Sequence, residues 1–126
     1  MAAANLEELY VILRGWALDG RPQTYKQLSE AYQEQTGDWL HWHGSWDHPL
    51  GDINNRLARI GAPALSAVVI LHDQNEPGGE FWGCAPNVPP RPRTDNARLA
   101  EWTRILNEVR AYPWPPALRD LIGINE

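Results

Sequence analysis

The chain has 126 residues, a formal net charge of −5 and one cysteine, Cys84. A chain of this length forms one domain and buries a core without disulfides, and one cysteine excludes a disulfide framework and a zinc site made only of cysteines. No apolar run reaches the roughly 20 residues of a membrane-spanning helix, and residues 1–5 lack a basic stretch followed by an apolar one, so we expect a cytoplasmic protein without a secretory signal.

Two amphipathic helices are predicted in the N-terminal part of the sequence. The first covers residues 5–18, where apolar side chains recur at the spacing of one helix face, with Asn5 as its cap and Gly20 at its end. The second opens at the capping-box pattern Thr24-Tyr-Lys-Gln27 and runs to about residue 35.

A loop rich in tryptophan and histidine follows, and a third helix comes after it. Residues 38–48 hold three tryptophans, three histidines and two aspartates, with no lysine or arginine and no clean period. We therefore predict an ordered loop there. Pro49 suits the first position of a helix over residues 49–61, whose buried stripe we expect to be Leu50, Ile53, Leu57 and Ile60.

A β-hairpin is predicted over residues 65–84. Residues 65–71 are apolar and β-branched, which is typical of a short strand. Residues 73–79 are dense in turn-forming residues. Residues 81–84 then form the returning strand of the predicted hairpin.

The remainder is a proline-rich connector over residues 85–94, followed by a C-terminal helix and tail over residues 95–126. Asp95 can cap the fourth helix, and residues 117–122 form a last turn that packs back onto the body. The order helix, helix, helix, hairpin, helix predicts a single α+β domain, mainly helical. It is the order of a winged helix-turn-helix with an added C-terminal helix.

Two segments carry a resemblance to a known family, Thr24-Tyr-Lys-Gln-Leu28 and Gly61-Ala-Pro-Ala-Leu-Ser-Ala-Val-Val69. Over roughly residues 24–83 the chain resembles the winged-helix, DNA-binding half of the alkylguanine-DNA alkyltransferases and alkyltransferase-like proteins. It also resembles small bacterial and phage winged-helix proteins of unassigned function, whose wing returns through a Pro-Gly-x-x-Phe stretch, here Pro77-Gly-Gly-Glu-Phe81. The alkyltransferase Pro-Cys-His-Arg motif does not occur in this chain, so the resemblance does not extend to alkyl transfer.

A DNA-associated regulatory or accessory role is the first functional hypothesis. Duplex DNA binding draws much of its affinity from basic residues that neutralise phosphates, and asparagine amides can pair with adenine edges. The hypothesis requires the basic residues to converge on one face, and a solvated helix face is the alternative for those on the third helix. The predicted DNA-binding residues are Lys26, Asn54, Asn55, Arg56, Arg59, Arg91 and Arg93.

The alternative function is that of an adaptor or inhibitor that binds another protein. Residues 65–84 carry three acidic residues and no basic one, so the predicted wing repels a phosphate backbone and suits a basic partner surface. Tryptophan is a frequent interface anchor, although packing in the core is equally open for the loop tryptophans. The predicted partner-binding residues are Trp39, Trp42, Trp46, Asp73, Glu76, Glu80 and Trp82.

Catalysis is poorly supported by the sequence. Ser45 and Ser66 lack a Gly-x-Ser-x-Gly pattern, and no phosphate-binding loop or dinucleotide fingerprint occurs. Cys84 beside Trp82 is typical of a buried small apolar residue. We therefore expect a binding protein without catalytic activity and without a cofactor.

The tryptophan-rich loop also holds a group of side chains with metal-like spacing. Alternate residues of an extended segment point the same way, so two histidines two positions apart can share one ion. The loop lacks a closed motif of four ligands. The weak candidate ligands are His41, His43 and His48, with Asp38 or Asp47.

Overall fold

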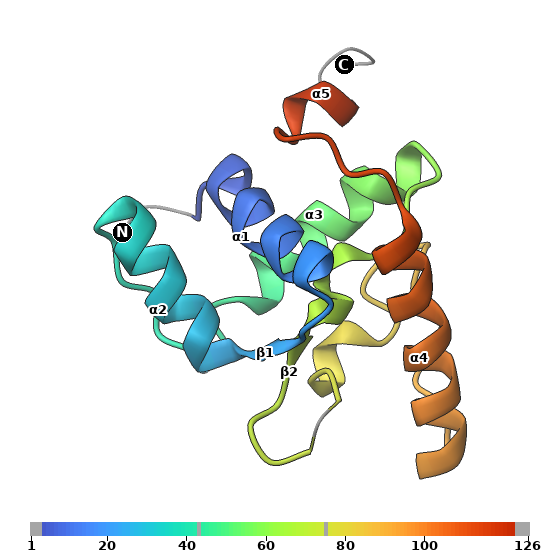
Figure 1. Cartoon of the computed structure of the whole chain (residues 1–126). Helices are drawn as coiled ribbons and strands as arrows, with labels where there is room; N and C mark the ends of the chain where they lie inside the picture. Colours follow the sequence, from blue (N-terminus) through green and yellow to red (C-terminus); the bar gives the residue numbers. More distant parts are fainter. Residues whose placement is uncertain (1–3, 43, 75, 123–126) are drawn as a thin grey trace.

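Helices make up most of this computed structural model, which describes residues 4–42, 44–74 and 76–122 (Figure 1). Within these residues the longer helices are α1 (Leu6–Asp19), α2 (Tyr25–Thr36), α3 (Asp47–Arg59) and α4 (Asp95–Ala111). The shorter elements are β1 (Gln23–Thr24), β2 (Val69–Ile70) and α5 (Arg119–Ile122). The fold is therefore helix-rich α+β, and none of the described helices is long and apolar enough to cross a membrane.

The ends of α1 and α2 are fixed by the caps that the sequence predicts. The Asn5 side chain accepts hydrogen bonds from two first-turn amides of α1, at 2.9 and 3.2 Å, and Gly20 ends that helix with a left-handed φ of 71°. Thr24 Oγ1 accepts from the Gln27 amide at 3.1 Å, and the Gln27 side chain accepts from the Thr24 amide at 2.8 Å. This reciprocal pair is the capping box, and it fixes how α2 leaves β1.

Helix α3 begins at Asp47, ahead of the predicted start at Pro49. Pro49 lies in its first turn, where the missing N–H leaves no helical hydrogen bond unmade. Leu50, Ile53 and Leu57 of the predicted stripe are buried in the core, whereas Ile60 follows the last residue of the helix and is only partly buried. This helix thus has the position in the chain that the sequence assigns to it.

The predicted hairpin over residues 65–84 is wrong. Residues Leu65–Val68 form a buried 3₁₀ turn, and β2 follows directly after it. Strand β2 pairs in parallel with β1, so that Thr24 lies opposite Ile70. Residues Gly79–Phe81 form a second 3₁₀ turn in place of the returning strand.

Two physical causes explain this difference. A short apolar run is typical of both a buried strand and a buried helical turn, and periodicity does not separate them. The turn packs against α1, α3 and α4, and Asn54 Oδ1 accepts from the Ser66 amide at 3.3 Å. In addition, parallel pairing joins segments far apart in the sequence, which a local pattern does not reveal.

Several tryptophans belong to the core, with their indole N–H groups bonded inside the molecule. Trp46 Nε1 donates to Ser29 Oγ at 2.8 Å. Trp102 Nε1 donates to the Ala67 carbonyl at 2.8 Å, and the Trp114 indole donates to a backbone carbonyl at 2.7 Å. The first two bonds join segments that are distant in the sequence, so these indoles fix the arrangement of the elements. The third, to Val109, ties the segment after α4 to the end of that helix.

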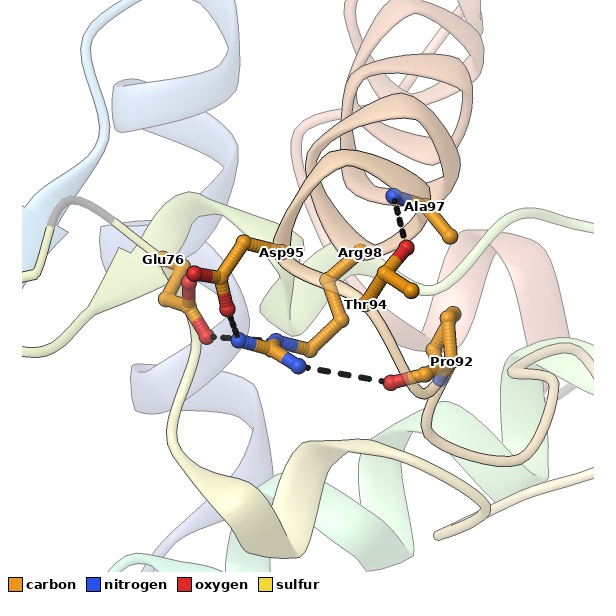
Figure 2. Close-up of polar contacts among 6 residues, drawn as sticks. All are labelled: Glu76, Pro92, Thr94, Asp95, Ala97 and Arg98. Carbon is orange, nitrogen blue, oxygen red and sulfur yellow. Dashed lines mark hydrogen bonds and ion pairs between the residues drawn. The ribbon is translucent and has the colours of Figure 1, made fainter.

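One arginine of α4 joins the loop after β2 to the connector before α4. Arg98 Nε donates to the Glu76 carboxylate at 3.3 Å, and the guanidinium also contacts Asp95 and the Pro92 carbonyl (Figure 2). The Arg98 side chain is 11% exposed, so its contacts with Glu76 and Pro92 are partly shielded from water, whereas Asp95 is at the surface. Thr94 caps α4 by accepting from a first-turn amide at 3.1 Å, and the predicted cap Asp95 is instead the first residue of the helix.

The C-terminal segment packs back onto α1. Tyr10 Oη donates to the Pro115 carbonyl at 2.6 Å. The Glu7 carboxylate accepts from the amides of Leu118 and Arg119 at 3.1 and 2.7 Å. These bonds hold the start of α5 against the N-terminal helix.

Candidate functional site

Two grooves lie next to each other where the start of α2, the start of α3 and the loop after β2 meet. The first, which we call the aromatic groove, has a volume of about 400 Å³. Its apolar lining comes from Tyr25, Trp42 and Leu71. Its polar lining comes from Thr24, Lys26, His72, Asp73 and Gln74. Because Tyr25 and Leu71 directly follow β1 and β2, the parallel pairing of these strands brings the two sides of this groove together.

Trp42 belongs to a cluster of rings at the surface. Trp39 and Trp42 meet edge to face, with ring centroids 6.0 Å apart, and His41 stacks on Trp42 at 4.5 Å. Lys26 Nζ lies 5.5 Å from the centroid of the Trp42 ring, in cation–π contact. Trp39 is 44% exposed. The loop before α3 thus presents aromatic surface to solvent beside the aromatic groove.

The second groove, which we call the acidic groove, also measures about 400 Å³. It is lined by the carboxylates of Asp47, Asp52 and Glu80, together with Trp82 and Cys84, and no lysine or arginine of the described chain lines it. Burial raises the pKa of the Asp47 carboxyl, and the negative charge of Glu80 raises it further. Neighbouring carboxylates that repel each other favour a positively charged ligand.

Tyr25 lies between the two grooves. It lines the aromatic groove and also a small cavity that it shares with Asp47, Glu80 and Cys84 of the acidic groove. The Tyr25 hydroxyl accepts from the Gly78 amide at 3.1 Å, and burial raises the pKa of this phenol. We refer to the residues of both grooves, together with Trp39, as the two-groove face.

Three of the predicted DNA-binding residues, Arg59, Arg91 and Arg93, lie toward opposite ends of α4. Arg59 lies at the C-terminal end of α3, which borders the C-terminal half of α4, because Ala58 and Glu108 line a common groove there. Arg91 and Arg93 precede the opposite end of α4, whose 17 residues span about 25 Å (Figure 1). The condition for a single basic face is therefore not met by these arginines.

The other predicted DNA contacts are engaged within the molecule. Asn54 is fully buried and its Nδ2 donates to Ser66 Oγ at 2.6 Å, which corrects the expectation that this amide faces a base edge. Arg56 Nε is paired with Asp52 at 3.1 Å. Asn55 is exposed, and its side chain donates to a carbonyl of its own helix at 2.9 Å.

The predicted partner-binding residues divide into surface and interior. At the surface, partly or fully exposed, lie Trp39, Trp42, Asp73 and Glu80. Trp46 is fully buried and Trp82 nearly so, which corrects their assignment as partner anchors. Glu76 is partly buried beside Arg98, so its charge is balanced inside the molecule.

The candidate metal ligands are spread over different surroundings. His41 stacks on Trp42, whereas His48 lines the acidic groove, and His43 lies outside the described residues. Among the residues that the structure describes, no three His, Cys, Asp or Glu side chains form a group suited to a metal ion.

The thiol of Cys84 is partly buried, and burial raises its pKa, which favours the neutral, unreactive form.

Sequence reasoning missed Tyr25 and Leu71 as site residues and did not connect Asp47 with Glu80. The capping box at Thr24 marks the start of α2 and could have drawn attention to Tyr25, its next residue. The proximity of Asp47 and Glu80 has no local signal in the sequence, because it depends on the second 3₁₀ turn, which takes the place of the predicted strand.

No family model, no curated protein and no solved structure matches this chain.

Proposed function

We propose that this chain is a non-catalytic protein-interaction module that binds a basic segment of a partner protein on the two-groove face. The observation that supports the proposal most is the difference in solvent exposure among the tryptophans. Trp39 and Trp42 remain partly exposed and in contact with each other. The tryptophans that lie in the core are Trp16, Trp46, Trp82, Trp102 and Trp114.

The aromatic groove supports a protein partner of modest contact area. Tryptophan side chains at a surface are frequent anchors of protein interfaces, because they bury a large area at little cost in conformational entropy. The groove of about 400 Å³ beside Trp42 has room for one or two apolar side chains of a partner. The bond from the Gly78 amide to Tyr25 holds one wall in place before any partner arrives.

The acidic groove supports a partner segment that carries lysine or arginine next to its apolar anchor. Asp47, Asp52 and Glu80 line this groove. Glu80 is exposed, whereas Asp52 is already paired with Arg56, so Asp47 and Glu80 are the carboxylates that attract a cation. Burial raises the pKa of Asp47 and the negative charge of Glu80 raises it further, so a cation placed here relieves the repulsion between these two carboxylates. The net charge of −5 also steers a basic segment toward the molecule.

DNA association stays a prediction. Arg59 lies at one end of α4, whereas Arg91 and Arg93 lie at the other. The winged-helix type of fold, the resemblance over residues 24–83 and the cytoplasmic location likewise stay predictions. The winged-helix prediction rests on the order helix, helix, helix, hairpin, and its hairpin does not form in the described part of residues 65–84. The resemblance rests on the segments 24–28 and 61–69.

The test starts from a library of random 12-residue peptides displayed on phage, selected against the full chain. We expect enriched peptides to combine an aromatic or aliphatic anchor with lysine or arginine. Their synthetic versions should lose about tenfold or more in affinity against Trp42→Ala, because a hot-spot tryptophan contributes about 1.4 kcal/mol or more. Titration followed by calorimetry measures this change.

Leu99→Ala is the matched control, because Leu99 is an exposed apolar residue of α4 that belongs to neither groove. Equal affinity of the selected peptides for the wild type, Trp42→Ala and Leu99→Ala would overturn the proposal. A labelled duplex that shifts in a gel at low salt, and no longer shifts at high salt, would support DNA association instead.

A further inference from the structure

Helix α1 carries apolar side chains that the core does not bury. Val11 is 44% exposed and Leu18 is 59% exposed, in a helix whose remaining apolar residues are buried or partly buried. The two positions are seven residues apart, which places them on one face of the helix, and Gly15 lies between them. This stripe is about 10 Å long, or two helical turns.

A groove of about 430 Å³ runs beside this stripe, between α1 and α2. Its floor contains the core residues Ile12 and Trp16, and Ala31 contributes from α2. Toward the start of α1, Gln35 Nε2 donates to the Glu8 carbonyl at 3.1 Å and links the two helices. The groove shares no lining residue with the two-groove face, so it is a separate surface.

Gly15 leaves the middle of this groove open. A Cβ atom at Gly15 meets no heavy atom within 4 Å, so the fold itself has space for a side chain there. The φ of Gly15 is not positive, and no backbone strain requires glycine. The missing side chain therefore lets an apolar side chain of a partner approach the backbone of α1.

The charges around the groove are negative. Asp19 and Glu34 line it, and Glu30 is exposed one turn before Glu34 on α2. No lysine or arginine of the described residues lines it. The cation Arg14 of α1 donates instead to the Trp114 carbonyl at 3.1 Å.

We propose that the groove between α1 and α2 is a second docking site, which takes a basic amphipathic helix of another protein. The apolar face of that helix packs on Val11, Gly15 and Leu18, at the i, i+4, i+7 spacing that helices share. Lysine or arginine at its margins pairs with Asp19 and Glu34. The chain then joins two partner segments, one in this groove and one on the two-groove face.

The experiment uses two synthetic 18-residue helical peptides, one of leucine, lysine and alanine and one with glutamate in place of each lysine. Chemical shifts of the ¹⁵N-labelled full chain report where each peptide binds. We expect the lysine peptide to shift the amides of Val11, Gly15, Leu18 and Ala31, and the glutamate peptide to leave them unchanged. Shifts elsewhere only, or equal shifts by both peptides, would overturn the proposal.

Variants separate this surface from the rest of the molecule. Gly15→Leu fills the groove and should weaken the lysine peptide at least tenfold, while a thermal melt shows that the fold is kept. Leu18→Ala should weaken it several-fold, whereas Leu99→Ala, an equally exposed leucine of α4 at 56% exposure, should change it less than twofold. Unchanged affinity in Gly15→Leu would contradict the assigned site.

Two further controls decide between this site and its competitors. Trp42→Ala should leave the affinity of the lysine peptide unchanged, and a loss there would assign that peptide to the two-groove face instead. Sedimentation of the chain alone should show a monomer. A concentration-dependent dimer that Gly15→Leu abolishes would assign the groove to a second copy and overturn the proposal.

Discussion

Among single residues, Trp46 ties the start of α3 to α2 through a buried hydrogen bond. It is fully buried, its N–H donates to Ser29 Oγ at 2.8 Å and its ring meets Tyr32 edge to face at 5.3 Å. The bond joins the residue before α3 to the middle of α2. Loss of either partner therefore leaves a buried polar group unpaired.

We predict that Trp46→Phe destabilises the fold by about 1–2 kcal/mol more than Trp82→Phe does. Both changes shrink a buried indole to a phenyl ring, but Trp82 Nε1 has no hydrogen-bond partner within the described structure, so only the first change breaks a bond. Urea unfolding measures the two free energies. Equal losses would show that the bond to Ser29 contributes nothing.

We expect the burial of Tyr10 to make the free energy of unfolding fall at alkaline pH. Burial raises the pKa of Tyr10 from 10.0 to about 12, and its hydroxyl donates to the Pro115 carbonyl at 2.6 Å. The folded state thus holds this proton more tightly than the unfolded state, so the stability from Tyr10 is complete below pH 10 and is lost as the pH rises toward 12.

Tyr10→Phe should therefore flatten the fall of stability between pH 10 and 12, by up to about 1.4 kcal/mol per pH unit. Unfolding free energies at pH 8, 10 and 11.5 check this for both proteins. A variant with the wild-type slope would indicate that other groups cause the alkaline loss.

At the scale of elements, Arg98 of α4 holds the loop after β2 through its contact with Glu76. Its guanidinium contacts Glu76, Asp95 and the Pro92 carbonyl, and its side chain is mostly buried. The loop is closed on itself by one backbone bond, from the Leu71 amide to the carbonyl of residue 76 at 2.8 Å. This closure positions Leu71 in the aromatic groove.

Arg98→Met should cost about 1–3 kcal/mol, because it leaves the partly buried Glu76 carboxylate without its cation. Hydrogen exchange at the Leu71 amide should become faster in this variant. The control is Arg104→Met, which removes an exposed arginine paired with Glu101 and should cost at most about 1 kcal/mol. Equal costs would argue against the role of Arg98.

The helices of this chain are readable from the sequence, but the sheet is not. Caps such as Asn5 and the Thr24 box are local bonds between residues close in sequence, so their pattern is sufficient to predict them. The pairing of β1 with β2 joins Gln23 to Val69, and Glu76 of the loop after β2 is paired with Arg98 on another helix. Neither the strand pairing nor the contact with Arg98 produces a periodic pattern or a residue spacing that could be recognised in the sequence.

The same limit applies to the candidate site. The composition of residues 38–48 draws attention to its tryptophans, but it does not show that Trp46 faces Ser29 while Trp39 faces water. Asn54 is a similar case, since its burial depends on Ser66 across the core. Side-chain direction at such positions is set by tertiary packing, which a single sequence does not contain.

At the scale of the whole molecule, negative charge is concentrated on both proposed docking surfaces. Carboxylates line both surfaces, whereas Arg59 lies toward one end of α4 and Arg91 and Arg93 toward the other. Binding of a lysine-rich segment to either surface should therefore weaken as salt rises, since exposed charges are screened over about 8–10 Å at physiological ionic strength. Affinities measured at 50 and 500 mM salt check this, and salt-independent binding would count against charge pairing.

The most direct test of the two-groove face follows the indole N–H signals of the seven tryptophans in a ¹H–¹⁵N spectrum, as a peptide from the phage selection is added. We predict that the signals of Trp39 and Trp42 shift and that those of Trp16, Trp102 and Trp114 stay in place. Signals of Trp39 and Trp42 that do not move while the peptide binds would contradict the claim that these two rings hold the partner.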